Sequence, residues 1–65
     1  MSKILLNQVG IVNIKETVRR IALKIKTANT DGVDFISLHK AIYTPEGVEH
    51  KRYVVNYKHI VFYED

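Results

Sequence analysis

The side chains with the clearest chemical potential are basic, and they are unevenly distributed along the chain. Residues 1–30 carry six Lys or Arg residues and a single acid, whereas residues 31–65 are slightly acidic. Guanidinium and ammonium groups bind phosphate, through contacts that position a protein on a nucleic acid but specify little sequence. A helix with a solvated basic face would give the same asymmetry, so both interpretations stay open. The residues that we predict to contact nucleic acid are Arg19, Arg20, Lys24 and Lys26 on a helix, and Lys40, Lys51 and Arg52 on a hairpin.

Signatures of catalysis and of metal binding are missing from the sequence. It contains no phosphate-cradling glycine loop, no nucleophile elbow and no H-E-x-x-H pattern. Ser37 shares a strand face with His39, but nothing marks a third member of a triad. Cysteine is absent, and the three histidines lack ligand spacing. We therefore predict a non-enzymatic protein with no catalytic residues, metal, cofactor or small-molecule substrate. Four tyrosines could stack on nucleobases, although a tyrosine in a strand more often packs against neighbouring side chains. They are Tyr43, Tyr53, Tyr57 and Tyr63.

The length of the chain predicts one domain, residues 1–65, with a small core. A chain of this size buries only about 60% of its unfolded surface, and such domains often rely on oligomerisation. A homodimer is the expected form. No apolar run approaches the roughly 20 residues of a membrane span. The start of the chain lacks the pattern of a signal peptide, so the expected location is the cytoplasm, with no membrane partner.

Two periodicities compete in residues 13–27. As a strand, Ile21, Leu23 and Ile25 would alternate with shorter or charged side chains. As a helix, the apolar residues at i, i+4, i+7 and i+11 form one stripe: Ile14, Val18, Ile21 and Ile25. Asn13 as the cap and Glu16 three residues later resemble a capping box, which favours the helix. If residues 17–27 form a strand instead, the alternative is a small all-β barrel.

We predict strands for the remaining segments. Residues 3–12 form one, and residues 33–43 and 48–63 form a long C-terminal β-hairpin that turns between Thr44 and Gly47. The predicted fold is α+β, in the order strand-helix-strand-strand. With Thr44 opposite Val48, Lys40 faces Arg52, an unfavourable pair unless an anion lies between them. We expect a slip of one residue to remove that pair.

Neither side of the predicted hairpin is cleanly polar. A single amphipathic helix covers only one face of a small sheet, so the other face needs a protein partner or a second copy. The predicted interface residues are Ile36, Leu38, Ile42 and Val54. The leading hypothesis is a nucleic-acid-binding or regulatory module. The alternative is a small protein-binding inhibitor or adaptor, of the kind that phages and mobile elements encode, acting through this face.

The C-terminal strand shows three partial resemblances. Residues 50–60, "HKRYVVNYKHI", resemble the "H-R-S-Y-x-V-N-x-x-x-I" stretch of LytTR-type DNA-binding domains, which implies a base contact for Lys51. "NYKHIVFYED" is similar to a strand of RelE/ParE-type toxins, which implies RNA cleavage. "YKH" is similar to the uridine-binding motif of Hfq-type Sm proteins, but the Sm glycines and aspartate are not in place. Because three families match one strand, we assign the chain to none of them.

Overall fold

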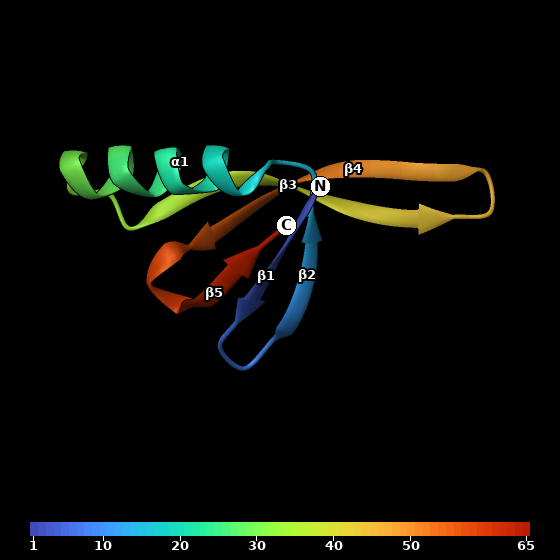
Figure 1. The fold of residues 1–65 in the computed structure, drawn as a ribbon, viewed down its shortest axis with the longest axis horizontal. Helices are drawn as coiled ribbons and strands as arrows, with labels where there is room; N and C mark the ends of the chain where they lie inside the picture. Colours follow the sequence, from blue (N-terminus) through green and yellow to red (C-terminus); the bar gives the residue numbers. More distant parts are fainter.

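The computed structural model describes all 65 residues and shows a small α+β domain, as predicted (Figure 1). One helix packs against an open sheet of five antiparallel strands in the order β4-β3-β2-β1-β5. The all-β barrel does not form, because the sheet stays open and residues 18–31 are helical. The elements are β1 (Ser2–Leu6), β2 (Gly10–Ile14), α1 (Val18–Asp31), β3 (Phe35–Thr44), β4 (Gly47–Asn56), the 3-10 turn η1 (Tyr57–His59) and β5 (Ile60–Glu64).

The N-terminal segment forms a hairpin of two strands, where the sequence had predicted one. β1 and β2 pair with Ile4 opposite Val12. The chain reverses at Gln8, which has a φ of 67°, and at Gly10, which has a φ of 105°. The second value strongly favours glycine, because it lies outside the regions that L-residues normally occupy. The turn lacks a familiar two-residue signal such as Asn-Gly, which explains why the reversal was missed.

The helix starts later than its sequence pattern indicated. Thr17 is the cap, and its side-chain oxygen accepts a hydrogen bond of 3.2 Å from the Arg20 amide. Asn13 and Ile14 belong to β2 instead. Gly32 ends the helix in the left-handed conformation, with a φ of 70°. The predicted apolar stripe is confirmed from Ile21 onward. The 14-residue helix is neither long enough nor apolar enough to cross a bilayer.

The β3–β4 hairpin turns where the sequence predicted, but its register differs by one residue. Thr44 pairs with Gly47, and its hydroxyl donates a hydrogen bond of 3.0 Å to the Gly47 carbonyl. The loop therefore contains two residues rather than three. Lys40 consequently faces Lys51, and not Arg52 as predicted. The expectation that such a slip would remove the like-charge pair was wrong, because it only exchanges one cation for another.

The C-terminal strand is broken in two, which the sequence had not indicated. β4 ends at Asn56, whose side chain accepts a hydrogen bond of 2.9 Å from the Lys58 amide. The three residues of η1 then carry the chain to the opposite edge of the sheet, where β5 pairs with β1. Such a short link between the two edge strands requires the sheet to curl strongly at this end.

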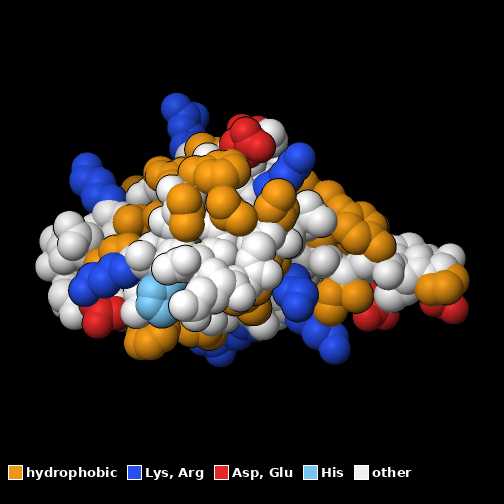
Figure 2. Space-filling model, turned by 90° about the horizontal axis from the view of Figure 1, so that it is seen from below, with side chains coloured by type: hydrophobic (Ala, Val, Ile, Leu, Met, Phe, Trp, Pro, Cys, Tyr) orange, Lys and Arg blue, Asp and Glu red, His pale blue; other side chains and the backbone are white.

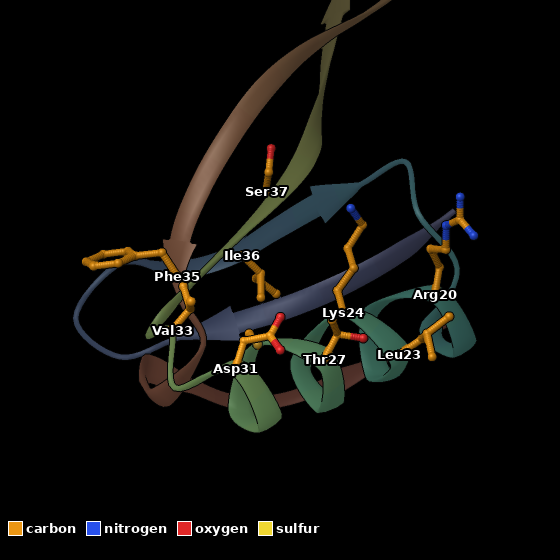
Figure 3. Close-up of a pocket in the computed structure, with 10 residues that line it drawn as sticks. Arg20, Leu23, Lys24, Thr27, Asp31, Val33, Phe35, Ile36 and Ser37 are labelled. Carbon is orange, nitrogen blue, oxygen red and sulfur yellow. The ribbon is translucent and has the colours of Figure 1, made fainter.

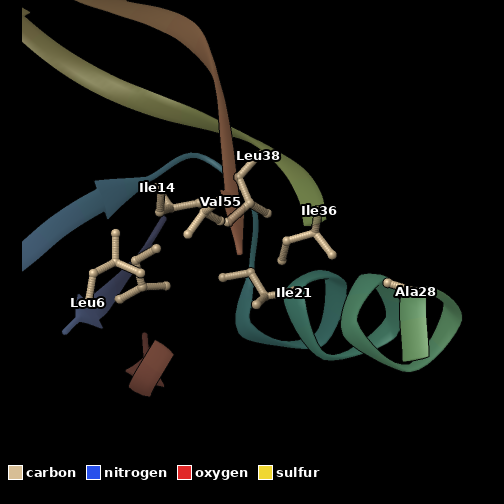
Figure 4. Packing of buried hydrophobic residues seen from close by; sticks show 8 residues of the cluster. Leu6, Ile14, Ile21, Ala28, Ile36, Leu38 and Val55 are labelled. Carbon is tan, nitrogen blue, oxygen red and sulfur yellow. The ribbon is translucent and has the colours of Figure 1, made fainter. Parts of the chain in front are cut away.

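The hydrophobic core lies between α1 and the concave face of the sheet (Figure 4). Its fully buried side chains are Ile4, Ile14, Ile21 and Leu38. Ile36 is also buried, so Ile36 and Leu38 are not available to a partner as we had predicted. The register places Val54 on the other face of the hairpin, opposite Ser37. The molecule measures 40 × 21 × 18 Å, because the distal half of the hairpin extends beyond the helix (Figure 1).

Candidate nucleic-acid interface

A groove of about 370 Å³ runs between α1 and the first residues of β3. The helix contributes residues spaced by three or four positions, which place them on one face. The strand side begins at Val33 and continues through the start of β3, and Figure 3 shows both walls. The lining residues are Arg20, Leu23, Lys24, Thr27, Ala28 and Asp31 from the helix, and Val33, Phe35, Ile36 and Ser37 from the strand side.

Two cations line this groove, and a third is bonded to one of its lining residues. Arg20 and Lys24 lie one helical turn apart on its helical wall. Arg52 in β4 does not line the groove; its Nε donates a hydrogen bond of 3.1 Å to the hydroxyl of Ser37, on the face of the hairpin opposite to Ile36 and Leu38. Asp31 is the only acid that lines the groove, and it lies near the C-terminal end of the helix. The end of the groove near the helix N-terminus is therefore positively charged.

These cations are not neutralised by the protein. Of the ten Lys and Arg residues, only Lys58 has a carboxylate oxygen within 4.0 Å, that of Asp34 at 2.9 Å. This contact raises the pKa of Lys58, mainly through the hydrogen bond to Asp34. Tyr57 next to it donates a hydrogen bond of 3.5 Å to Asn29. Tyr57 and Lys58 in the "YKH" stretch therefore make contacts within the fold.

The other predicted cations lie outside the groove. Arg19 and Lys26 are exposed on α1 but do not line the groove. Lys40 and Lys51 face each other farther along the hairpin. The Lys40 ammonium lies 5.5 Å from the centroid of the Tyr53 ring, a distance typical of cation–π contact. The seven predicted residues thus divide into a groove pair, Arg52 on the other face of the hairpin, an off-groove helix pair and a hairpin pair.

The predicted interface residues are similarly divided. Ile36 lines the groove while buried, and Leu38 lies wholly in the core. Ile42 is half-buried. Val54 is 53% exposed and lines a second hollow. These four residues do not form one surface.

The second hollow, of about 290 Å³, lies between the β1–β2 turn and the end of β4. Phe35 lines both this hollow and the groove, and it is 57% exposed. Sequence reasoning missed Phe35 and Ser37 as site residues. The available signal was the position of Phe35 directly after a turn and next to the buried Ile36, where period-2 alternation points it away from the core.

A different arrangement links Glu16 to His39. One Glu16 carboxylate oxygen accepts a hydrogen bond of 2.8 Å from the His39 amide, and the other lies 2.7 Å from His39 Nδ1. Burial raises the pKa of Glu16, but the hydrogen bonds from His39 lower it by more, so the pKa lies below its ordinary value of 4.5. The buried Ser2 hydroxyl also donates to the Glu16 carbonyl. Glu16 therefore has a structural role here, not the capping-box role that we predicted.

These contacts reinforce the weakest junction of the sheet. β2 and β3 pair only at Ile14 and Lys40, next to a hydrogen bond of 2.8 Å from the Lys15 amide to the His39 carbonyl. The Glu16 carboxylate accepts the His39 amide hydrogen bond that a backbone carbonyl would accept in a continuous strand pairing.

No group of three His, Asp or Glu side chains is arranged to hold a metal ion. Comparison with models of protein families, with curated proteins and with solved structures found no match.

Proposed function

We propose that this domain is a non-enzymatic module that binds the phosphate backbone of a nucleic acid in the groove between α1 and β3. The observation that carries the proposal is that Arg20 and Lys24 line one groove without a carboxylate partner, while Arg52, also without one, is hydrogen-bonded to the lining residue Ser37. Cations brought together in this way repel one another, and a polyanion relieves the repulsion. We propose the cytoplasm as its location.

Each of these cations has a distinct task in this proposal. Arg52 presents its guanidinium in an orientation held by Ser37. Because a guanidinium offers donors in a planar fork, an oriented arginine favours a phosphate in one geometry. Lys24 acts as a mobile point charge beside it. Lys40 and Lys51 continue the positive track along the hairpin. Such contacts confer affinity and orientation, with little sequence preference.

A salt titration of two matched double variants tests the proposal. Arg20→Ala/Lys24→Ala removes two groove cations, and Arg19→Ala/Lys26→Ala removes the same charge from the same helix outside the groove. Each phosphate contact contributes about 0.7–0.9 to the slope of log K against log salt, so the groove variant should lose about 1.4–1.8 of slope. Fluorescence anisotropy with a labelled oligonucleotide measures the binding constant at each salt concentration. Equal losses in both variants would mean diffuse attraction, and no binding at low salt would refute the proposal.

A second candidate function is protein binding through the convex face of the sheet. Ile11, Leu5 and Phe62 stand directly opposite one another across β2, β1 and β5, and Ile11 is 64% exposed. Figure 2 shows hydrophobic side chains gathered on the face seen from below, with Lys and Arg at its rim. An exposed apolar row of this kind suits a protein partner or a second copy of the chain.

The test of this second function is Ile11→Asp, with Lys3→Gln on the same face as the charge-matched control, because each change lowers the net charge by one. If the row is an interface, the solution mass from light scattering should fall to that of the monomer only in Ile11→Asp. A wild-type protein that is already monomeric at high concentration would exclude self-association through this face.

A further inference from the structure

Phe35 is the exposed aromatic residue that joins the two hollows. It opens β3, and its partner in β4 is Asn56, so no aromatic ring packs across the strand from it. Val54 is the diagonal neighbour on the same face and is 53% exposed. Leaving a ring of this size in water forgoes the stabilisation that burial would bring. The ring is therefore free to pack against a ligand.

The position of Phe35 along the groove determines how it lies relative to the cations. Figure 3 shows its ring projecting away from the helix, at the end of the groove opposite Arg20. Lys24 and Ser37 lie between these two ends (Figure 3). A chain that places phosphates along the cations would therefore reach Phe35 as it leaves the groove.

The second hollow adjoins Phe35 on its other side. Val54, on the same face of the hairpin, and the exposed residues Asn7 and His59 border it together with Phe35. Amide and imidazole groups can hydrogen-bond to the edge of a base, while aromatic rings contact its face. A volume of about 290 Å³ is near the lower end of small-molecule sites, which suits one planar ring system.

We infer that a nucleobase stacks on Phe35 in the second hollow while the flanking phosphates bind the groove cations, so that the ligand is single-stranded. This inference rests on the proposed function. Bases within a duplex are stacked on each other and expose only their edges, whereas a single strand can turn a base outward. DNA and RNA share this chemistry, and the experiment separates them.

The experiment measures binding of matched oligonucleotides to variants of the full chain. The probes are single strands of thymidylate and of uridylate, an abasic strand of the same length, and a duplex. Stacking contributes enough that Phe35→Ala should weaken the two base-containing strands by about 5- to 150-fold. Binding of the abasic strand should not change. Tyr43→Ala is the matched control, because Tyr43 is 58% exposed and lines neither hollow.

A spectroscopic readout separates stacking from a structural effect. The chain has no tryptophan, so Phe35→Trp introduces a single reporter, and Tyr43→Trp gives its control. Base-containing strands should quench the fluorescence of Phe35→Trp, and the abasic strand should not. The tighter of the thymidylate and uridylate strands identifies the nucleic acid.

The outcomes distinguish this inference from the proposed function. If Phe35→Ala binds every probe as the wild type does, or if the duplex binds more tightly than the single strands, stacking is refuted. In that case a loss of salt slope in Arg20→Ala/Lys24→Ala would still support the phosphate groove. If no oligonucleotide binds to the wild type at low salt, both ideas fail.

Discussion

Two charged regions on either side of Leu38 differ in how their charges are matched. His39 follows Leu38 in β3, and its side chain and amide are both hydrogen-bonded to Glu16. Ser37 precedes Leu38, accepts a hydrogen bond from Arg52 and lines the groove of Arg20 and Lys24, and no carboxylate neutralises these cations. The first region is electrostatically complete within the protein and joins two strands. The second is incomplete, which is the property expected of a binding site.

The largest expected effect comes from breaking the element that both regions share. Leu38→Asp places an unpaired charge at a wholly buried position between Ser37 and His39. In a domain this small the change should abolish folding, because its cost of at least about 4–5 kcal/mol is comparable to the total stability. Circular dichroism during heating measures it. Ile11→Asp, at an exposed position, should keep a cooperative transition, and a folded Leu38→Asp would contradict the described core.

The region around Glu16 and His39, whose charges are matched, should show the next largest loss of stability. Glu16→Ala leaves the His39 amide without its acceptor, which should cost about 1–3 kcal/mol of unfolding free energy. Urea denaturation measures the loss, and Glu49→Ala at an exposed position should change the stability by no more than about 0.5 kcal/mol. Salt-dependent binding by folded Glu16→Ala should match the wild type. Equal stability of the two variants would remove the structural role assigned to Glu16.

The pH dependence of stability sharpens the same contrast. The pKa of Glu16 is lower in the folded protein than its ordinary value of 4.5, so its ionised form stabilises the fold above that value. The contribution should disappear as the pH falls through the lowered pKa. Melting temperatures of the wild type and Glu16→Ala should therefore differ most near pH 7 and converge toward pH 3. A constant difference across this range would show that the carboxylate charge is not involved.

The region of the groove cations, which no carboxylate neutralises, should give the smallest change in stability. Arg20→Ala/Lys24→Ala removes exposed or half-exposed cations that have no carboxylate partner, so its unfolding free energy should stay within about 0.5 kcal/mol of the wild type. Urea denaturation of this variant measures the difference, with Arg19→Ala/Lys26→Ala as the control. A much larger loss would mean that the groove cations have a packing role and would weaken the comparison.

The parts of the fold that the sequence predicted correctly depend on local signals. The helical stripe from Ile21 onward, the reversal between Thr44 and Gly47 and the α+β class all follow from periodicity and turn residues within a few positions. The missed features also have local causes. The β1–β2 reversal relies on a positive φ at Gln8, and the break after Asn56 depends on one side-chain hydrogen bond. Neither position shows a strong turn signal.

The site was predicted only in part, because its members meet through long-range pairing. Arg20 and Lys24 were identifiable as cations on one helix, but the hydrogen bond of Arg52 to the lining residue Ser37 depends on the observed register of β3 and β4. Both faces of the hairpin are partly apolar, so alternation alone does not distinguish a register from one shifted by a residue. Phe35 was missed for the same reason.

The sequence by itself determined the composition of charge, the helix and the place of the main turn, since these depend on neighbouring residues. Tertiary structure decided which cations meet and which are neutralised. Packing of Leu38 and Ile36 against Ile21 orients β3, and this orientation places Ser37 beside Arg52 and His39 beside Glu16. The physical reason is that burial of an apolar side chain depends on the whole assembly, whereas a turn or a helical stripe forms from local preferences.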